Sequence, residues 1–275
     1  MKIDAHQHFW KYNPVRDNWI TDEMSIIRKD FLPPDLKTLL HDNGIDGCVT
    51  VQSDQSYEEN FFQLNNAAEN DFIKGVVGWI DFTEIDLENK LNELKEYAKL
   101  KGFRHVLQGE PQRDLMLEPF FINGIALLTK YNFTYDILIF ADQIKYASKL
   151  VNMFPEQKFV LDHIAKPDIK NYSITEWKKD IEILSKHGNV YCKISGMVTE
   201  ADWKNWHKED FIPYLDVVVN AFGAERIMFG SDWPVCLVAA SYSQMKSIVD
   251  DYFAAFSDGE KNFFYGKNAM RFYNL

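Results

Sequence analysis

Cysteine is scarce in this sequence, with only Cys48, Cys192 and Cys236 among 275 residues. The three are far apart and show no paired spacing, which excludes a disulfide framework and a zinc finger. Each lies in an apolar stretch, as is typical of a buried free thiol. Because such usage suits a reducing compartment, we expect a cytoplasmic protein.

Long hydrophobic runs and an excess of positive charge are also lacking. No apolar stretch approaches the roughly 18 residues of a membrane span, and the N-terminus has neither the basic nor the apolar region of a secretory signal. The net charge is −11, whereas phosphate binding needs clustered lysine and arginine. We therefore expect no nucleic-acid partner and no membrane partner.

The length and composition are those of a soluble globular protein. Hydrophobic residues make up 46% and charged residues 26% of the sequence. A single α/β barrel needs roughly 250 residues, although two ordinary domains would also fit the length. Since no Gly-, Ser- or Pro-rich linker divides the chain, we expect one domain over residues 1–275.

Eight short apolar runs have the character of buried parallel strands. They are Lys2–Phe9, Gly47–Ser53, Ile73–Asp81, Gly102–Glu110, Phe133–Phe140, Lys158–His163, Val190–Gly196 and Arg226–Pro234. Charged segments with helical spacing lie between them, at Leu87–Leu100, Gln143–Phe154, Ile174–His187 and Tyr242–Ala255. This alternation predicts parallel βαβ units. Eight units favour a closed (β/α)₈ TIM-like barrel over an open doubly wound sheet with similar local patterns.

In such a barrel the catalytic groups come from the carboxyl ends of the strands. His6 and His8 lie two residues apart in the first run, so both point to one face and can bind one divalent cation. The irregular, aromatic stretch Lys11–Pro34 follows directly. Barrel enzymes place active-site loops there, although a simple surface excursion explains it equally well.

Two further candidates end the sixth and eighth runs. His163 shares the parity of Phe159 and Leu161, which is typical of a core histidine as well as of a ligand. Its neighbour Asp162 points to the opposite face, and we expect a structural role for it. Asp232 is a candidate ligand or base, although an aspartate near a proline also caps helices.

Together, His6, His8, His163 and Asp232 give three imidazoles and one carboxylate at the ends of strands one, six and eight. The first and last strands are neighbours once a barrel closes. This mixture suits zinc or a similar divalent ion that keeps one position open for water.

Other polar residues interrupt the apolar strands. Alternation forbids Arg104 and His105 from both pointing inward, and we favour His105 as the pocket residue. Lys193 either contacts substrate oxygens, which we prefer, or pairs with an acidic residue behind the barrel. The remaining candidates for substrate binding are Gln52, Trp79, Gln108 and Trp233, of which the tryptophans would serve equally as core.

Several motifs resemble those of the amidohydrolase-2 family, in particular its sugar-lactonase branch of fuconolactonase-like and rhamnonolactonase-like proteins. They are the segments 3–10 (IDAHQHFW), 78–81 (GWID), 103–108 (FRHVLQ), 161–167 (LDHIAKP), 192–196 (CKISG), 229–234 (FGSDWP) and 268–273 (NAMRFY). These motifs follow the family order over almost the whole chain.

The resemblance implies a TIM-like barrel that hydrolyses a lactone, with His6, His8, His163 and Asp232 at the central positions. Metal-dependent decarboxylases of the wider family carry a histidine after the fifth strand, where this chain has Phe140-Ala141-Asp142. That departure disfavours decarboxylation. Some lactonases of the superfamily are thought to work without a metal, so zinc is the expected ion but its necessity stays open.

Our leading hypothesis is therefore an enzyme that opens the ring of a small-molecule aldonolactone. Asp232 would act as general base, and His163 would assist it. His6, His8 or a metal, with His105 or Lys193, would stabilise charge on the carbonyl oxygen. The alternatives are a hydrolase of a non-sugar lactone, a decarboxylase, or a non-catalytic ligand-binding barrel. Monomeric and homo-oligomeric states both remain open.

Overall fold

A computed structural model describes residues 1–275 and contains one eight-stranded sheet. All neighbouring strands are parallel and follow one another in chain order. The strands are β1 (Ile3–Gln7), β2 (Gly47–Val51), β3 (Ile73–Gly78), β4 (Leu100–Val106), β5 (Thr134–Leu138), β6 (Phe159–Leu161), β7 (Val190–Ile194) and β8 (Ile227–Phe229). All eight predicted strands are thus present, although each ends earlier than predicted.

The sheet closes between its first and last strands. The backbone N–H of His8 donates to the carbonyl of Trp233 at 2.7 Å, and the N–H of Asp232 donates to the carbonyl of His6 at 2.8 Å. A Cβ on Gly230 would lie only 2.7 Å from the Cβ of His6, so glycine permits this close approach. The expected (β/α)₈ barrel is confirmed.

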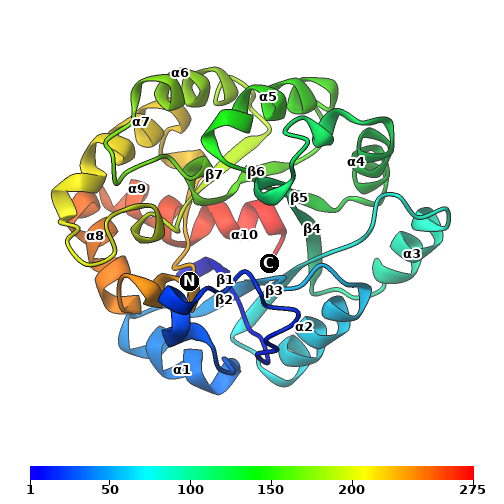
Figure 1. Ribbon diagram of the computed structural model, residues 1–275, viewed down its shortest axis with the longest axis horizontal. Helices are drawn as coiled ribbons and strands as arrows, with labels where there is room; N and C mark the ends of the chain where they lie inside the picture. Colours follow the sequence, from blue (N-terminus) through cyan, green and yellow to red (C-terminus); the bar gives the residue numbers. More distant parts are fainter.

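Helices surround the strands on the outside, as Figure 1 shows. They are α1 (Pro33–Asp42), α2 (Tyr57–Glu69), α3 (Leu87–Leu94), α4 (Pro119–Tyr131), α5 (Ile144–Met153), α6 (Thr175–Leu184), α7 (Ile212–Phe222) and α8 (Tyr242–Tyr252), followed by α9 (Asp258–Asn262) and α10 (Asn268–Tyr273). The predicted helix Leu87–Leu100 is too long, because Leu100 is the first residue of β4. The buried leucines of α3 are therefore Leu87, Leu91 and Leu94, and Ala98 lies in the turn that follows.

The last helix, α10, crosses the middle of the ring in Figure 1 and covers the amino-terminal end of the barrel. Its residues Ala269, Phe272 and Tyr273 belong to one buried apolar cluster with inward-facing residues of the strands, which include Ile3 of β1 and Val49 of β2. A larger cluster of 65 buried residues fills the space between the strands and the outer helices. With one end covered, the opposite end of the barrel is where a pocket can form.

The three cysteines are buried and free, as predicted. Burial raises the pKa of the Cys48 thiol well above its usual value, which keeps it protonated and unreactive. None of the helices is both long enough and apolar enough to cross a membrane.

Candidate active site

A pocket of about 300 Å³ opens at the carboxyl ends of the strands. His8, Gln52, His163 and Asp232 reach it from the ends of β1, β2, β6 and β8. Trp10 and the segment Lys11–Pro34 also contribute to its wall, the segment through Arg16 and Trp19. Three further polar side chains that line the pocket are Arg104, Gln108 and Lys166.

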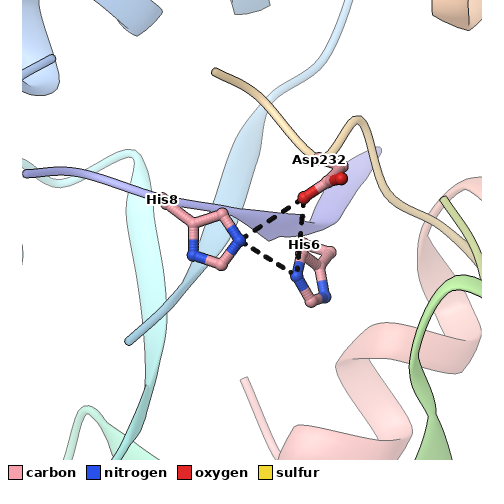
Figure 2. Close-up of side chains that lie close together, drawn as sticks. All are labelled: His6, His8 and Asp232. Atoms are coloured by element: carbon pink, nitrogen blue, oxygen red, sulfur yellow. Dashed lines mark hydrogen bonds and ion pairs between the residues drawn. The ribbon is translucent and has the colours of Figure 1, made fainter. Parts of the chain in front are cut away.

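His6, His8 and Asp232 converge at the base of this pocket (Figure 2). The two Nε2 atoms are 3.2 Å apart, and Asp232 Oδ1 lies 3.4 Å from that of His8 and 3.9 Å from that of His6. His163 Nε2 lies 3.9 Å from the same carboxylate oxygen. The donor atoms of His6, His8 and Asp232 thus lie within 4.8 Å of one another, and His163 borders them as part of a second such group with His6 and Asp162.

A register shift in β1 makes this convergence possible. The shift falls between Asp4 and Gln7, and Ile3 and Ala5 already face the barrel interior. A bulge reverses the alternation of side chains, so His6 and His8 also reach the inner side. Gln7 points outward, where its amide contacts the Cys48 thiol.

Burial sets the charges of these groups. It lowers the pKa of His6 and of His163 well below the usual value, so both rings are neutral near pH 7. Burial alone would raise the pKa of Asp232, but the neighbouring imidazoles of His163 and His8 outweigh it and lower that pKa. Asp232 is therefore an ionised carboxylate facing neutral imidazoles.

The hydrogen bond of His8 determines which of its nitrogens faces the pocket. Its Nδ1 lies 2.8 Å from the carbonyl oxygen of Val51, which can only accept, so Nδ1 carries the proton. In the neutral ring the lone pair is then on Nε2, which faces Asp232 and His6. A carboxylate oxygen and imidazole lone pairs directed at one point form a donor set that fits a divalent cation.

A left-handed turn after β6 carries His163 and Lys166. The φ angles of residues 163–166 are 53°, 50°, 59° and 48°, a conformation that costs L-residues about 1–2 kcal/mol each. The Trp177 indole donates to the carbonyl of Ile164 at 2.8 Å and holds the turn against α6. Strain of this kind persists at functional sites because the surrounding structure enforces it.

Arg104, and not His105, faces the barrel interior from β4. Its guanidinium donates to the backbone carbonyl of Gln52 at 2.7 Å and lies 3.3 Å from Asp162 Oδ2. His105 points outward, where its Nε2 lies 3.0 Å from Glu110 Oε1. The choice of His105 as the inward residue was wrong, because a buried arginine is tolerated where carboxylates and carbonyls pair it.

Lys193 and Asp162 are also placed differently from expectation. Lys193 is fully buried below the pocket, with Asp136 Oδ2 at 2.5 Å and Asp162 Oδ1 at 3.0 Å. It therefore does not line the pocket, and its acidic partners lie inside the barrel. Asp162 does point opposite to Leu161, but this is the interior side, as the position of Val160 shows.

The remaining candidates divide between pocket and core. Gln52 and Gln108 line the pocket. Trp233 is buried against Phe9 and Phe31, and Trp79 lies beside His105. Neither tryptophan therefore lines the pocket.

The segment after β5 brings no imidazole to the pocket. Asp142 pairs instead with the guanidinium of Arg113 at 2.6 and 2.8 Å. Arg16, Asp54 and Lys166 also lie in the pocket wall, and none of them was predicted from the sequence. Lys166 was within a motif that had been noted, but nothing in the alternation of a strand predicts the turn that presents it.

The amidohydrolase family model matches residues 3–275 of the chain. The chain belongs to the amidohydrolase family. This amidohydrolase is 34% identical over 286 residues to L-fucono-1,5-lactonase of Burkholderia multivorans, with 100% of this chain and 96% of that protein covered. It is 24% identical to L-rhamnono-gamma-lactonase of Scheffersomyces stipitis over 68% of this chain and 62% of that protein.

Solved structures agree with this membership. A crystal structure of an amidohydrolase from Burkholderia multivorans with bound zinc superposes on this amidohydrolase with a TM-score of 0.97 at 35% identity, covering 100% of this chain and 99% of that one. The 5-carboxyvanillate decarboxylase of Sphingomonas paucimobilis superposes with a TM-score of 0.63 at 14% identity, which is a likeness of fold alone.

Proposed function

We propose that this amidohydrolase opens the ring of a sugar lactone, with L-fucono-1,5-lactone as the first candidate substrate. The observation that carries the proposal is an ionised Asp232 facing the imidazoles of His6, His8 and His163 at the base of a polar pocket. The full-length similarity to a protein named L-fucono-1,5-lactonase supports the substrate class. We further propose that residues 1–275 act as one cytoplasmic domain, which the buried free thiols favour.

Asp232 would act as general base. Its carboxylate takes a proton from water while the water oxygen attacks the lactone carbonyl carbon. The C–O bond of the ring then breaks, and Asp232 returns its proton to the departing ring oxygen. One water is consumed, and the product is a hydroxy acid.

Two cations of the pocket wall would stabilise the charge that develops on the carbonyl oxygen. Arg104 is held by Gln52 and Asp162, and Lys166 lies 3.1 Å from Glu200 Oε1. Such preorganised donors stabilise an oxyanion without reorganising during the reaction. The same cations would pair with the carboxylate of the product, and they take the role first assigned to His105 and Lys193.

We propose that the divalent ion held by His6, His8, His163 and Asp232 is zinc, because these ligand types suit it and a related amidohydrolase structure contains it. When bound, such an ion polarises the carbonyl and lowers the pKa of water.

An initial-rate screen of purified protein tests the proposed reaction. Fucono-, rhamnono-, galactono- and arabinonolactones would be assayed with and without a chelator, and acid release would be followed with a pH indicator. We expect at least one sugar lactone to open with kcat/KM near 10⁴ M⁻¹s⁻¹ or above, the usual range for enzymes. Ring opening of none of them would overturn the proposal.

A further inference from the structure

His6 has neighbours of opposite hydrogen-bonding character at the same ring nitrogen. Its Nδ1 lies 3.2 Å from Lys193 Nζ, which can only donate, and 3.2 Å from Asp162 Oδ1, which can only accept when ionised. A neutral imidazole carries one proton on one of its two nitrogens. The two neighbours therefore favour opposite tautomers of His6.

Both charges at this nitrogen are held firmly. Lys193 is fully buried between Asp136 Oδ2 at 2.5 Å and Asp162 Oδ1 at 3.0 Å, and the Tyr273 hydroxyl donates to Asp136 at 2.7 Å. Asp162 in turn lies between Lys193 and the guanidinium of Arg104. These two cations also stand beside the ring of His6, so it remains neutral and only the place of its proton is in question.

The tautomer with the proton on Nε2 suits the site without a cation. Lys193 then donates to Nδ1, and the Nε2–H of His6 faces the lone pair of His8 Nε2 at 3.2 Å. A neutral His8 ring that donates from Nδ1 to Val51 has its lone pair on Nε2. One conflict remains, since Arg104 Nη1 lies 3.3 Å from His6 Nε2, but this donor has Asp162 Oδ2 at the same distance.

The opposite tautomer places two lone pairs against each other. With the proton on Nδ1, the bare Nε2 atoms of His6 and His8 face one another at 3.2 Å beside the carboxylate of Asp232. A divalent cation bound by these atoms turns that repulsion into attraction. The proton on Nδ1 then has Asp162 Oδ1 as its acceptor.

We propose that His6 is a two-state ligand, in which Lys193 holds the Nε2–H tautomer without a cation and Asp162 accepts the Nδ1 proton when a cation binds. In the change, the ring gives up the proton on Nε2 and takes one on Nδ1, so its net charge is constant. Lys193 and Asp162 are thus positioning residues. The inference rests on the metal set of the proposed function but not on the identity of the substrate.

Nitrogen-15 NMR of the histidine rings tests the inference directly. The full-length protein would be measured after treatment with a chelator and again after addition of zinc, and His6 would be assigned from the signals missing in His6→Gln. We expect His6 to carry its proton on Nε2 before zinc and on Nδ1 after it. The same tautomer in both spectra would overturn the inference, as would a His6 signal that zinc leaves unchanged.

Calorimetric titration with zinc supplies an independent readout. Asp162→Asn should weaken zinc binding about 10- to 100-fold, as is usual for the loss of a partner that orients a ligand, and leave the zinc-free tautomer unchanged. The matched control is Asp136→Asn, which removes a carboxylate that touches Lys193 but not His6 and should change zinc affinity less than threefold. Equal losses in the two variants would show that only the charge of the cluster matters and would overturn the role of Asp162.

These readouts do not depend on turnover. A protein with the expected tautomers but no activity on sugar lactones would retain this inference and lose the proposed substrate. If Asp162→Asn fails to fold, the two wild-type spectra still decide the matter.

Discussion

At the scale of single residues, the site depends on which of two adjacent side chains of β4 faces inward. Arg104 is 5% exposed, and its guanidinium contacts Gln52, Asp162 and His6. His105 lies on the outer side against α4 and pairs with Glu110. Arg104 and His105 therefore have different roles although they are adjacent in one strand, and substituting each in turn can distinguish their contributions to activity.

Arg104→Lys should lower kcat/KM at least tenfold, because lysine keeps the charge but loses the planar fork that reaches Gln52 and Asp162 together. His105→Ala should leave kcat/KM within twofold of the wild type, since it removes a partly exposed contact with Glu110 that is worth at most about 1 kcal/mol. Steady-state kinetics on the best lactone from the screen checks both variants. A larger loss for His105→Ala than for Arg104→Lys would return the catalytic role to His105.

At the scale of elements, the left-handed turn of residues 163–166 determines where the second half of the site lies. Its first residue packs directly on the segment after β7: Ser195 Oγ lies 2.9 Å from His163 Nδ1, and Gly196 leaves room for the ring. A Cβ on Gly196 would come within 2.5 Å of His163 Nδ1. The glycine thus fixes the distance between two strand ends.

Gly196→Ala should lower kcat at least tenfold by displacing the ring of His163. The matched control is Gly44→Ala, because Gly44 has a φ of 65°, close to the 60° of Gly196, but no atom within 4 Å of the added Cβ. Both variants should lose about 1–2 kcal/mol of unfolding free energy from backbone strain, as measured by urea denaturation. Equal activities in the two variants would refute the steric role of Gly196.

The elements themselves were predictable where hydrophobic pattern alone decides them. The eight buried strands appear in the sequence as short apolar runs, and α5, α6 and α8 appear as segments with helical spacing of apolar residues. All of these elements were therefore predicted. The facing of individual side chains was harder to predict, because the bulge in β1 and the turn after Leu161 break the alternation on which the argument relied. The interior of β4 and β6 is charged, and hydrophobicity therefore indicated the wrong face for His105 and Asp162.

At the scale of the whole molecule, the packed apolar core and the polar pocket lie at opposite ends of the barrel. The amino-terminal end is covered by α10 and packed with apolar side chains (Figure 1). The carboxyl end holds the pocket, and the pairs of Lys193 and Arg104 with Asp136 and Asp162 lie beneath it. Two cations and two carboxylates balance in charge there, which allows polar groups to fill the barrel below neutral imidazoles.

The central claim is that Asp232 performs proton transfer for the opening of a sugar lactone. The most direct measurement is the turnover of L-fucono-1,5-lactone by Asp232→Asn beside Asp142→Asn, whose carboxylate pairs with Arg113 outside the pocket. We expect the first variant to lose about 10²- to 10⁴-fold in kcat, the usual contribution of a general base, and the second to keep kcat within twofold. Near-normal turnover by folded Asp232→Asn would contradict the account.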